Sequence, residues 1–277
     1  MLKPIEEIPS LENELSSLDF KKMHDKYRID INAKLKPEPI ALSLGEYKYK
    51  NNYYPTPFGT YGNFSCLVGP SKSYKTFLKS AIIASYIGGK SNFYFPSLKG
   101  HDTKSKFVID VDTEQSTFHT QKVAKRVCEM VGSNYDLFVP FGLREEDSKN
   151  RFKFIEWIML ESEYRNDIGL ITIDGAADIL ETVNDLDVSN KIVQSMMKWT
   201  SVSNAHLCTI LHKNHGTDKP TGHLGSAIMK KAETVAFVER DDDEVTVTSN
   251  FTRNIPFDVL RFKINENFLP KESEESY

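Results

Sequence analysis

The chain has 277 residues, a formal net charge of −4 from 35 basic and 39 acidic side chains, and 39% hydrophobic residues. This composition is that of a globular protein, and it excludes a collagen, a coiled-coil rod and a chain that is disordered throughout. The length predicts one α/β domain with extensions, or at most two small domains. The near-neutral charge leaves nucleic-acid binding open because local patches set the contact with phosphates.

Two segments precede the predicted core. Residues 1–37 are mostly polar with apolar residues at helical spacing, so we predict a helical N-terminal extension. Residues from about 34 to 62 contain four prolines and many aromatic residues, which is typical of short strands and turns. At the other end, the acidic residues 271–277 are expected to form a disordered tail. The main domain is therefore predicted to span residues 38–270.

Strands and helices alternate through most of this domain, as βαβ units with a parallel sheet require. We predict an α/β fold with a mainly parallel, twisted sheet flanked by helices. Three further segments are separated by turns and predict antiparallel strands at the C-terminal end: 234–238, 244–249 and 260–264. The predicted core strands are 63–68, 106–111, 135–139, 168–173 and 205–211, and the predicted helices are 75–87, 117–131, 152–164 and 188–202.

The sharpest motif is GPSKSYKT at 69–76, which matches the phosphate-binding pattern GxxxxGK[ST] except that Tyr74 replaces the second glycine. A strand precedes the motif and a helix follows it, so backbone N–H groups at the helix start would face a triphosphate. Lys75 would reach the β- and γ-phosphates and Thr76 would bind Mg²⁺. An ordinary polar turn is the alternative, and the flanking elements favour the nucleotide site. The predicted nucleotide-binding residues are Gly69, Pro70, Ser71, Lys72, Ser73, Tyr74, Lys75, Thr76 and Phe77.

Carboxylates follow two of the predicted strands, at the sheet edge where α/β proteins bind ligands. Asp174 ends the apolar strand 168–173 and has the Walker B form, so it would hold the Mg²⁺ shell; a turn aspartate is the alternative. Glu114 follows strand 106–111 and would orient the attacking water. Asp110 and Asp112 compete for that role, and an exposed loop carboxylate is the alternative for Glu114.

The last core strand ends at His212, a polar residue that could contact the γ-phosphate, or could simply belong to a polar loop. The histidines in this region match no zinc-binding spacing. The glycine-rich segment 216–226 is either a mobile loop that contacts a nucleic-acid strand or a plain surface loop. Arg253 is our candidate for a charge-stabilising finger that enters a neighbouring subunit's site, and an exposed surface arginine is the alternative.

In this order, the motifs GPSKSYKT, VIDVDTEQS, LITIDGAAD and TILHKNHG resemble the RecA-like P-loop ATPases. Within that group the chain looks like RepA-type ATPases of plasmids and AAA-family ATPases carried on mobile elements of Bacteroidetes-type bacteria. The resemblance implies a RecA fold, ATP and Mg²⁺ as cofactors, DNA (single-stranded) as a partner, and a homo-oligomeric ring such as a hexamer. It assigns the Walker A pair to Lys75 and Thr76, the catalytic glutamate to Glu114, Walker B to Asp174 and the sensor to His212.

Two departures from this pattern bear on function. Tyr74 stands where the motif has glycine, and Thr221 stands where relatives often have arginine. The first hypothesis is an ATP-driven motor of DNA replication or mobilisation, helicase-like in its action. The second is a nucleotide-gated regulatory or scaffold protein with little turnover, which both departures favour. A small-molecule kinase ranks last because no arginine-rich lid is present.

The expected location follows from what the sequence lacks. No segment approaches the roughly 18 apolar residues of a membrane span, and the acidic N-terminus has no apolar core of a secretory signal. Cys66, Cys128 and Cys208 are scattered, with no spacing typical of zinc sites or disulfide frameworks. We therefore expect a cytoplasmic protein with reduced thiols and no membrane partner.

Overall fold

The structure is a computed structural model that describes residues 19–182, 185–213, 220 and 222–273. The chain divides into two compact units, Met1–Pro37 and Glu38–Tyr277. In the first unit, helix α2 (Phe20–Tyr27) begins where the Asp19 side chain accepts a hydrogen bond from the Lys22 backbone N–H. The helix buries none of its side chains, and residues 28–37 are not helical, so the described part of the extension is less helical than predicted.

The second unit begins with a small antiparallel sheet. Strands β1 (Ile40–Tyr49) and β2 (Asn52–Thr60) form a hairpin, which confirms the strands predicted there from proline and aromatic content. Strand β4 (Leu98–Gly100) pairs with β1 and completes the order β2-β1-β4. The sequence did not predict β4, because three residues are too short to show an alternating pattern.

The main sheet has the strand order β12-β11-β10-β9-β3-β8-β7-β5-β6 within the described residues. Strands β6, β5, β7, β8, β3 and β9 are parallel, and β9 to β12 pair antiparallel, which confirms the predicted fold class. The strands are β3 (Phe64–Gly69), β5 (Phe107–Asp112), β6 (Phe138–Gly142), β7 (Ile168–Asp174), β8 (His206–His212), β9 (Thr234–Asp241), β10 (Glu244–Thr252), β11 (Leu260–Ile264) and β12 (Pro270–Glu272).

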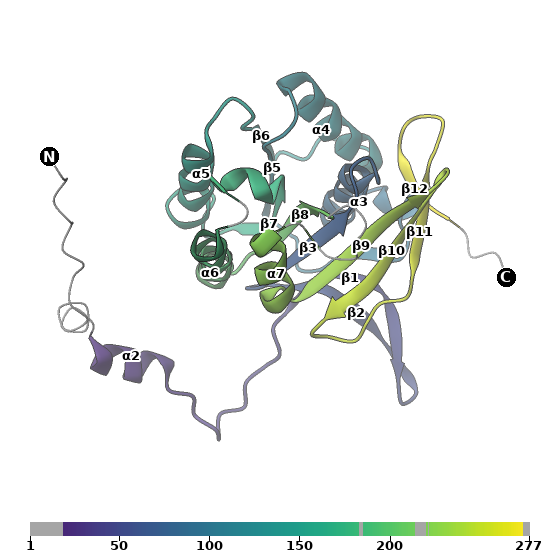
Figure 1. The fold of residues 1–277 in the computed structure, drawn as a ribbon. Helices are drawn as coiled ribbons and strands as arrows, with labels where there is room; N and C mark the ends of the chain where they lie inside the picture. Colours follow the sequence, from purple (N-terminus) through teal and green to yellow (C-terminus); the bar gives the residue numbers. More distant parts are fainter. Residues whose placement is uncertain (1–18, 183–184, 214–219, 221, 274–277) are drawn as a thin grey trace, which may run out of the picture. The chain divides into compact units, whose positions relative to one another are not determined.

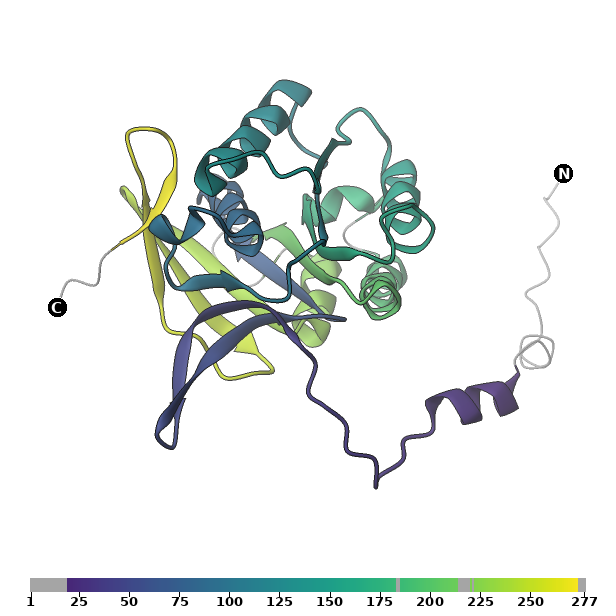
Figure 2. The same cartoon turned by 180° about the vertical axis from the view of Figure 1, so that it is seen from behind.

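Helices cover both faces of this sheet (Figures 1 and 2). Helices α3 (Lys75–Ile87) and α4 (Thr117–Val131) contribute to one apolar cluster, and α5 (Ser148–Leu160), α6 (Leu186–Ser203) and α7 (Gly222–Lys231) to the other. Alternate residues of β3 feed the two clusters, since Leu67 lies in the first and its neighbours Cys66 and Val68 lie in the second. This alternation is the period of a strand buried on both faces. Short 3-10 helices lie at Ser91–Phe93 and Ala176–Ile179.

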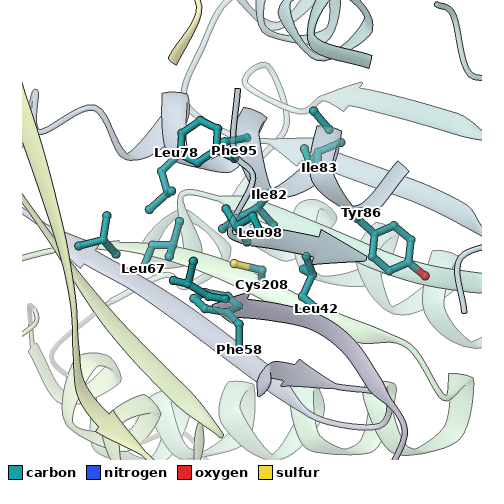
Figure 3. Packing of buried hydrophobic residues seen from close by; sticks show 14 of the residues in the cluster. Leu42, Phe58, Leu67, Leu78, Ile82, Ile83, Tyr86, Phe95, Leu98 and Cys208 are labelled. Atoms are coloured by element: carbon teal, nitrogen blue, oxygen red, sulfur yellow. The ribbon is translucent and has the colours of Figure 1, made fainter. Parts of the chain in front are cut away.

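The small sheet packs on α3 through buried side chains of the hairpin base (Figure 3). Leu42 and Phe58 are in the same cluster as Ile82 and Tyr86 of α3. Burying a side chain of this size contributes about 1.5–3 kcal/mol, so the hairpin base is a firm part of the core. The hairpin tip, by contrast, is exposed.

Strand β9 pairs antiparallel with β10 as predicted, and it also pairs parallel with β3 because helix α7 returns the chain to the start of that strand. Two expectations require correction. The predicted disordered tail begins too early, since Lys271 and Glu272 pair with β11; residues 274–277 lie outside the described residues. Residues 222–226, expected as loop, form the first half of α7, where buried Leu224 anchors the helix to the core.

Candidate nucleotide-binding site

The loop after β3 lies between β8 and β9, at the carboxyl edge of the parallel strands. A Cβ added at Gly69 would collide with the backbone oxygen of Val238 on β9, so the packing of the two strands demands glycine there. The loop then turns back on itself, with the Ser73 N–H donating to the Pro70 carbonyl at 3.4 Å. Helix α3 begins at Lys75, so free backbone N–H groups of its first turn face the loop.

Tyr74 occupies the position where the phosphate-loop pattern has glycine, and it adopts the left-handed conformation, with φ 65° and ψ 25°. Its ring lies 5.1 Å from the Phe77 ring, centroid to centroid, and the Arg240 guanidinium lies 4.3 Å from the Tyr74 ring centroid. Left-handed backbone costs a residue with a side chain about 1–2 kcal/mol, and these two ring contacts offset much of that cost. The loop therefore keeps the glycine conformation without glycine.

Replacing Tyr74 separates the two effects. Tyr74→Ala keeps the backbone strain and loses both ring contacts, so we expect it to lower the free energy of unfolding by about 1–2 kcal/mol. Tyr74→Gly loses the same contacts but relieves the strain, so it should be more stable than the alanine variant by about 1 kcal/mol. Urea unfolding of the three proteins measures both differences. Equal stability of the glycine and alanine variants would show that the left-handed conformation is not strained.

Lys75 is almost fully buried at the centre of the loop. Its Nζ donates to the carbonyl oxygens of Gly69 at 2.9 Å and Pro70 at 2.6 Å. Burial lowers the pKa of this lysine, and the nearby carboxylates of Asp174 and Glu114 act in the opposite direction. A phosphate placed here would add the negative charge that such a desolvated cation lacks.

Asp174 ends β7 and points at the start of α3. Its Oδ2 accepts a hydrogen bond from the Thr76 hydroxyl at 3.1 Å and lies 3.3 Å from the Nζ of Lys79. Lys79 also lies 2.9 Å from Oδ1 of Asp110, in fully buried surroundings. Burial by itself lowers the pKa of Lys79, but Asp110 and Asp174 outweigh it and hold the pKa above its usual range.

Lys79 was not among the predicted site residues. The signal was present, because a lysine one turn after Lys75 falls on the apolar face of the predicted helix 75–87. A buried lysine needs a buried acid, and the candidates were the carboxylates at the ends of the neighbouring strands. Asp110 therefore forms an ion pair with Lys79, and it also accepts a hydrogen bond from the Thr172 hydroxyl at 2.6 Å. These contacts hold the Asp110 carboxylate beneath the site.

Asp112 and Glu114 take different positions after β5. Oδ1 of Asp112 accepts hydrogen bonds from the backbone N–H groups of Glu114 and Gln115, so this carboxylate shapes the turn, and burial raises its pKa. Oε1 of Glu114 lies 3.4 Å from Nε2 of His212, whose Nδ1 lies 3.5 Å from the Nζ of Lys75. The hydrogen bond from His212 holds the pKa of Glu114 below its usual value. Glu114 is therefore kept ionised, and its side chain is 40% exposed.

A cavity of about 310 Å³ connects these groups. Arg126 of α4, another residue not predicted, lines its far side, 3.7 Å from the Phe77 ring centroid and 3.2 Å from the Ser80 hydroxyl. Burial lowers the pKa of Arg126 to about 10. The sequence hint was an arginine at helical spacing among the apolar Val123, Val127 and Met130 of the predicted helix 117–131. The cavity is lined by Lys72, Ser73, Tyr74, Lys75, Thr76, Phe77, Glu114, Gln115, Val123, Arg126, Asp174 and His212.

The residues present fit a Mg²⁺–nucleotide. Thr76 and Asp174 present two adjacent oxygen ligands, as Mg²⁺ shared with phosphates requires. The buried Ser73 hydroxyl in the loop has no hydrogen-bond partner among the described residues. Among the described residues, no group of three or more His, Cys, Asp or Glu side chains could hold a metal ion by itself. A bound cation would therefore depend on oxygens supplied by the nucleotide.

Arg253 is not brought to this cavity. Thr252 pairs with Thr234, and Thr234 pairs with Ser65 near the start of β3, so Arg253 lies at the sheet edge opposite the loop. Its guanidinium donates to the Lys231 carbonyl at 2.9 Å. Residues 214–219 and 221 of the glycine-rich segment, including Thr221, lie outside the described residues.

No family model and no curated protein matches the sequence. The crystal structure of the RadB recombinase is similar in fold, with a TM-score of 0.52 and 15% sequence identity over 79% of this chain and 93% of that chain. The fold is RecA-like. The likeness confirms the RecA-like fold that the resemblance implied, while the narrower RepA-type and AAA-family assignment stays a prediction. In the part of the chain that the structure describes, no helix has the length and apolar character to cross a membrane.

Proposed function

We propose that this RecA-like protein binds and hydrolyses Mg-ATP in the cavity above the 69–76 loop. The single observation that carries the proposal is that Lys75, Thr76, Asp174, Glu114 and His212, which come from four separate segments, line or border one cavity. Mg²⁺ when bound would neutralise phosphate charge and would be held by Thr76 and Asp174. The known fold supports this proposal by placing the loop at the edge where α/β sheets bind ligands.

The proposed roles follow from charge and position. The loop N–H groups and Lys75 bind the phosphates, and Lys75 stabilises negative charge that develops during cleavage. Glu114, ionised at neutral pH, accepts a proton from the attacking water. His212 lies between Glu114 and Lys75, so it can link the state of the bound phosphate to strand β8.

We further propose that hydrolysis serves work on single-stranded DNA, in replication or mobilisation, by a homo-oligomeric ring such as a hexamer. The support is the motif order in the sequence and the RecA-like fold shared with a recombinase. The experiment is ATP hydrolysis by the purified protein with and without single-stranded DNA, using Lys75→Ala as the blank. Turnover that rises with DNA supports this function.

One observation favours a second candidate, a nucleotide-gated regulatory or scaffold protein with little turnover. Lys79 already neutralises Asp174, the carboxylate proposed for the Mg²⁺ shell. Mg²⁺ and the buried Lys79 ammonium group would compete for the same Asp174 carboxylate. This competition would weaken Mg²⁺ binding and therefore lower ATP turnover. In the same assay, ATP that binds without turnover above the blank supports this second function.

Arg253 stays our proposed finger, and its distance from its own loop requires that it act on a neighbouring subunit. Arg253→Ala should leave ATP binding by the isolated subunit unchanged and lower turnover of the assembled protein by at least about 100-fold. Light scattering on the same samples measures the size of the assembly, so a loss of turnover caused by dissociation is distinguished from a loss of catalysis. The control is Lys230→Ala, an exposed cation on the nearby α7. Full turnover of an assembled Arg253→Ala protein would make Arg253 an ordinary surface residue.

A further inference from the structure

The β1–β2 hairpin carries a surface that ATP binding does not use. Its tip stands clear of the main sheet in both views (Figures 1 and 2). Tyr49, Tyr53 and Tyr54 near the tip are 57%, 66% and 40% exposed. Large aromatic side chains gathered on a projecting surface are typical of an interaction site, whereas single exposed ones are ordinary.

Three tyrosines share one face of the hairpin. The register pairs Tyr47 with Tyr54 and Tyr49 with Asn52, and alternate residues of a strand point to the same side. The ring contacts agree, because the Tyr54 centroid lies 5.8 Å from that of Tyr47 and 6.5 Å from that of Tyr49. We call Tyr47, Tyr49 and Tyr54 the tyrosine face. Tyr53 pairs with Lys48 and lies on the opposite side.

The charge nearest the tyrosine face is positive. The Nζ of Lys50, in the turn, lies 5.4 Å from the Tyr49 ring centroid. Glu46 is the one acidic residue of the hairpin; by strand alternation it lies on the opposite side, where its carboxylate is 3.6 Å from Lys99. Where the face meets the body, a cavity of about 510 Å³ is lined by Tyr47, Pro57 and Arg253, followed by Asn254, Ile255 and Pro256.

We propose that the tyrosine face binds single-stranded nucleic acid, with bases stacked on Tyr49 and Tyr54 and a phosphate neutralised by Lys50. Every base has an aromatic face, so stacked rings beside cations bind a strand without needing its sequence. The proposal deepens the proposed DNA-directed function by naming its contact surface, and it rests on that function for the choice of ligand.

A second copy of the chain is the less suitable occupant. β2 is an edge strand of the small sheet, and edge strands commonly bind another strand through free backbone groups. Here Pro55 and Pro57 lack the N–H donors that such pairing needs. The aromatic rings and cations thus remain the binding features, and a polyanion with aromatic bases complements them.

The test is fluorescence anisotropy of the full chain with labelled oligodeoxythymidylate and, in parallel, oligouridylate. The Tyr49→Ala, Tyr54→Ala double variant should bind about tenfold more weakly or worse, and the corresponding phenylalanine double variant should bind as the unchanged protein does. Lys50→Ala should reduce the salt dependence of binding. Tyr53→Ala is the matched control, because Tyr53 is more exposed than either varied tyrosine but lies on the opposite side, and it should bind normally. The tighter of the two probes identifies DNA or RNA as the ligand.

Unchanged affinity in the alanine double variant, or an equal loss in Tyr53→Ala, would overturn the inference. An oligomer that dissociates in the double variant would also overturn it, because the face would then be a contact between copies. Circular dichroism confirms that each variant is folded, as its exposed position leads us to expect. ATP binding is measured on the same samples. A protein that binds ATP but neither oligonucleotide overturns this inference and leaves the ATPase proposal standing. A protein that binds an oligonucleotide but not ATP overturns the ATPase proposal and leaves this inference standing.

Discussion

Lys75→Ala is expected to abolish ATP binding and hydrolysis. Lys75 is the buried cation at the centre of the loop, where its Nζ is held by the carbonyls of Gly69 and Pro70. Burial has already stripped this ammonium group of much of its water, so a bound phosphate gains a strong, unscreened interaction. Alanine removes this charge and leaves the carboxylates of Asp174 and Glu114 unbalanced beside the phosphates.

The measurement is equilibrium binding of a fluorescent ATP analogue, followed by steady-state phosphate release. We expect affinity to fall by about 100-fold or more, as for loss of a charged contact in a desolvated site. Lys125→Ala, an exposed lysine on α4, is the control and should behave as the unchanged protein. If the Lys75 variant bound and hydrolysed ATP normally, the nucleotide could not lie in this loop.

Glu114→Gln is expected to keep ATP bound while hydrolysis falls by about 100-fold or more, the usual contribution of a general base. Glutamine has the shape of glutamate and can still bond to His212, so the cavity should keep its form. It cannot accept the proton of the attacking water at neutral pH. The His212 hydrogen bond that lowers the Glu114 pKa ensures that the native carboxylate is ionised there.

A single-turnover experiment separates the two steps, since ATP binding and phosphate release are followed in the same mixture. Glu129→Gln changes an exposed glutamate on α4 and serves as the control. Turnover that survives in Glu114→Gln would transfer the role to Asp112, the remaining carboxylate at this strand end. Asp110 is a poor substitute because it is buried against Lys79 and Thr172.

The sequence predicted the local parts of this site well. Helix α3 has the predicted bounds, and Lys75 and Thr76 lie at its first turn, because a strand, a polar turn and an amphipathic helix each depend on residues close in sequence. Asp174 and His212 lie at the expected strand ends for the same reason. The order of such elements also predicted the parallel sheet, since βαβ connections allow few alternatives.

Other features could not be read from neighbours in sequence. Several of these features depend on partners far along the chain. They are the length of the helical extension, the parallel pairing of β9, the pairing of Lys271 and the helical state of 222–226. The tyrosine face likewise needs the hairpin register, because a shift of one residue would divide the rings between two sides.

By itself, then, the sequence determined which residues stand in the 69–76 loop and at the strand ends, and the α/β class that brings those ends to one edge. Only the tertiary structure decided how their charges are balanced: Lys79 joins Asp110 and Asp174 beneath the cavity, and Arg240 covers the ring of Tyr74. The physical reason is that helical and strand periodicity act over a few residues. A buried charge, by contrast, is stable only beside an opposite charge or a hydrogen-bond partner, and the fold can supply that partner from any part of the chain.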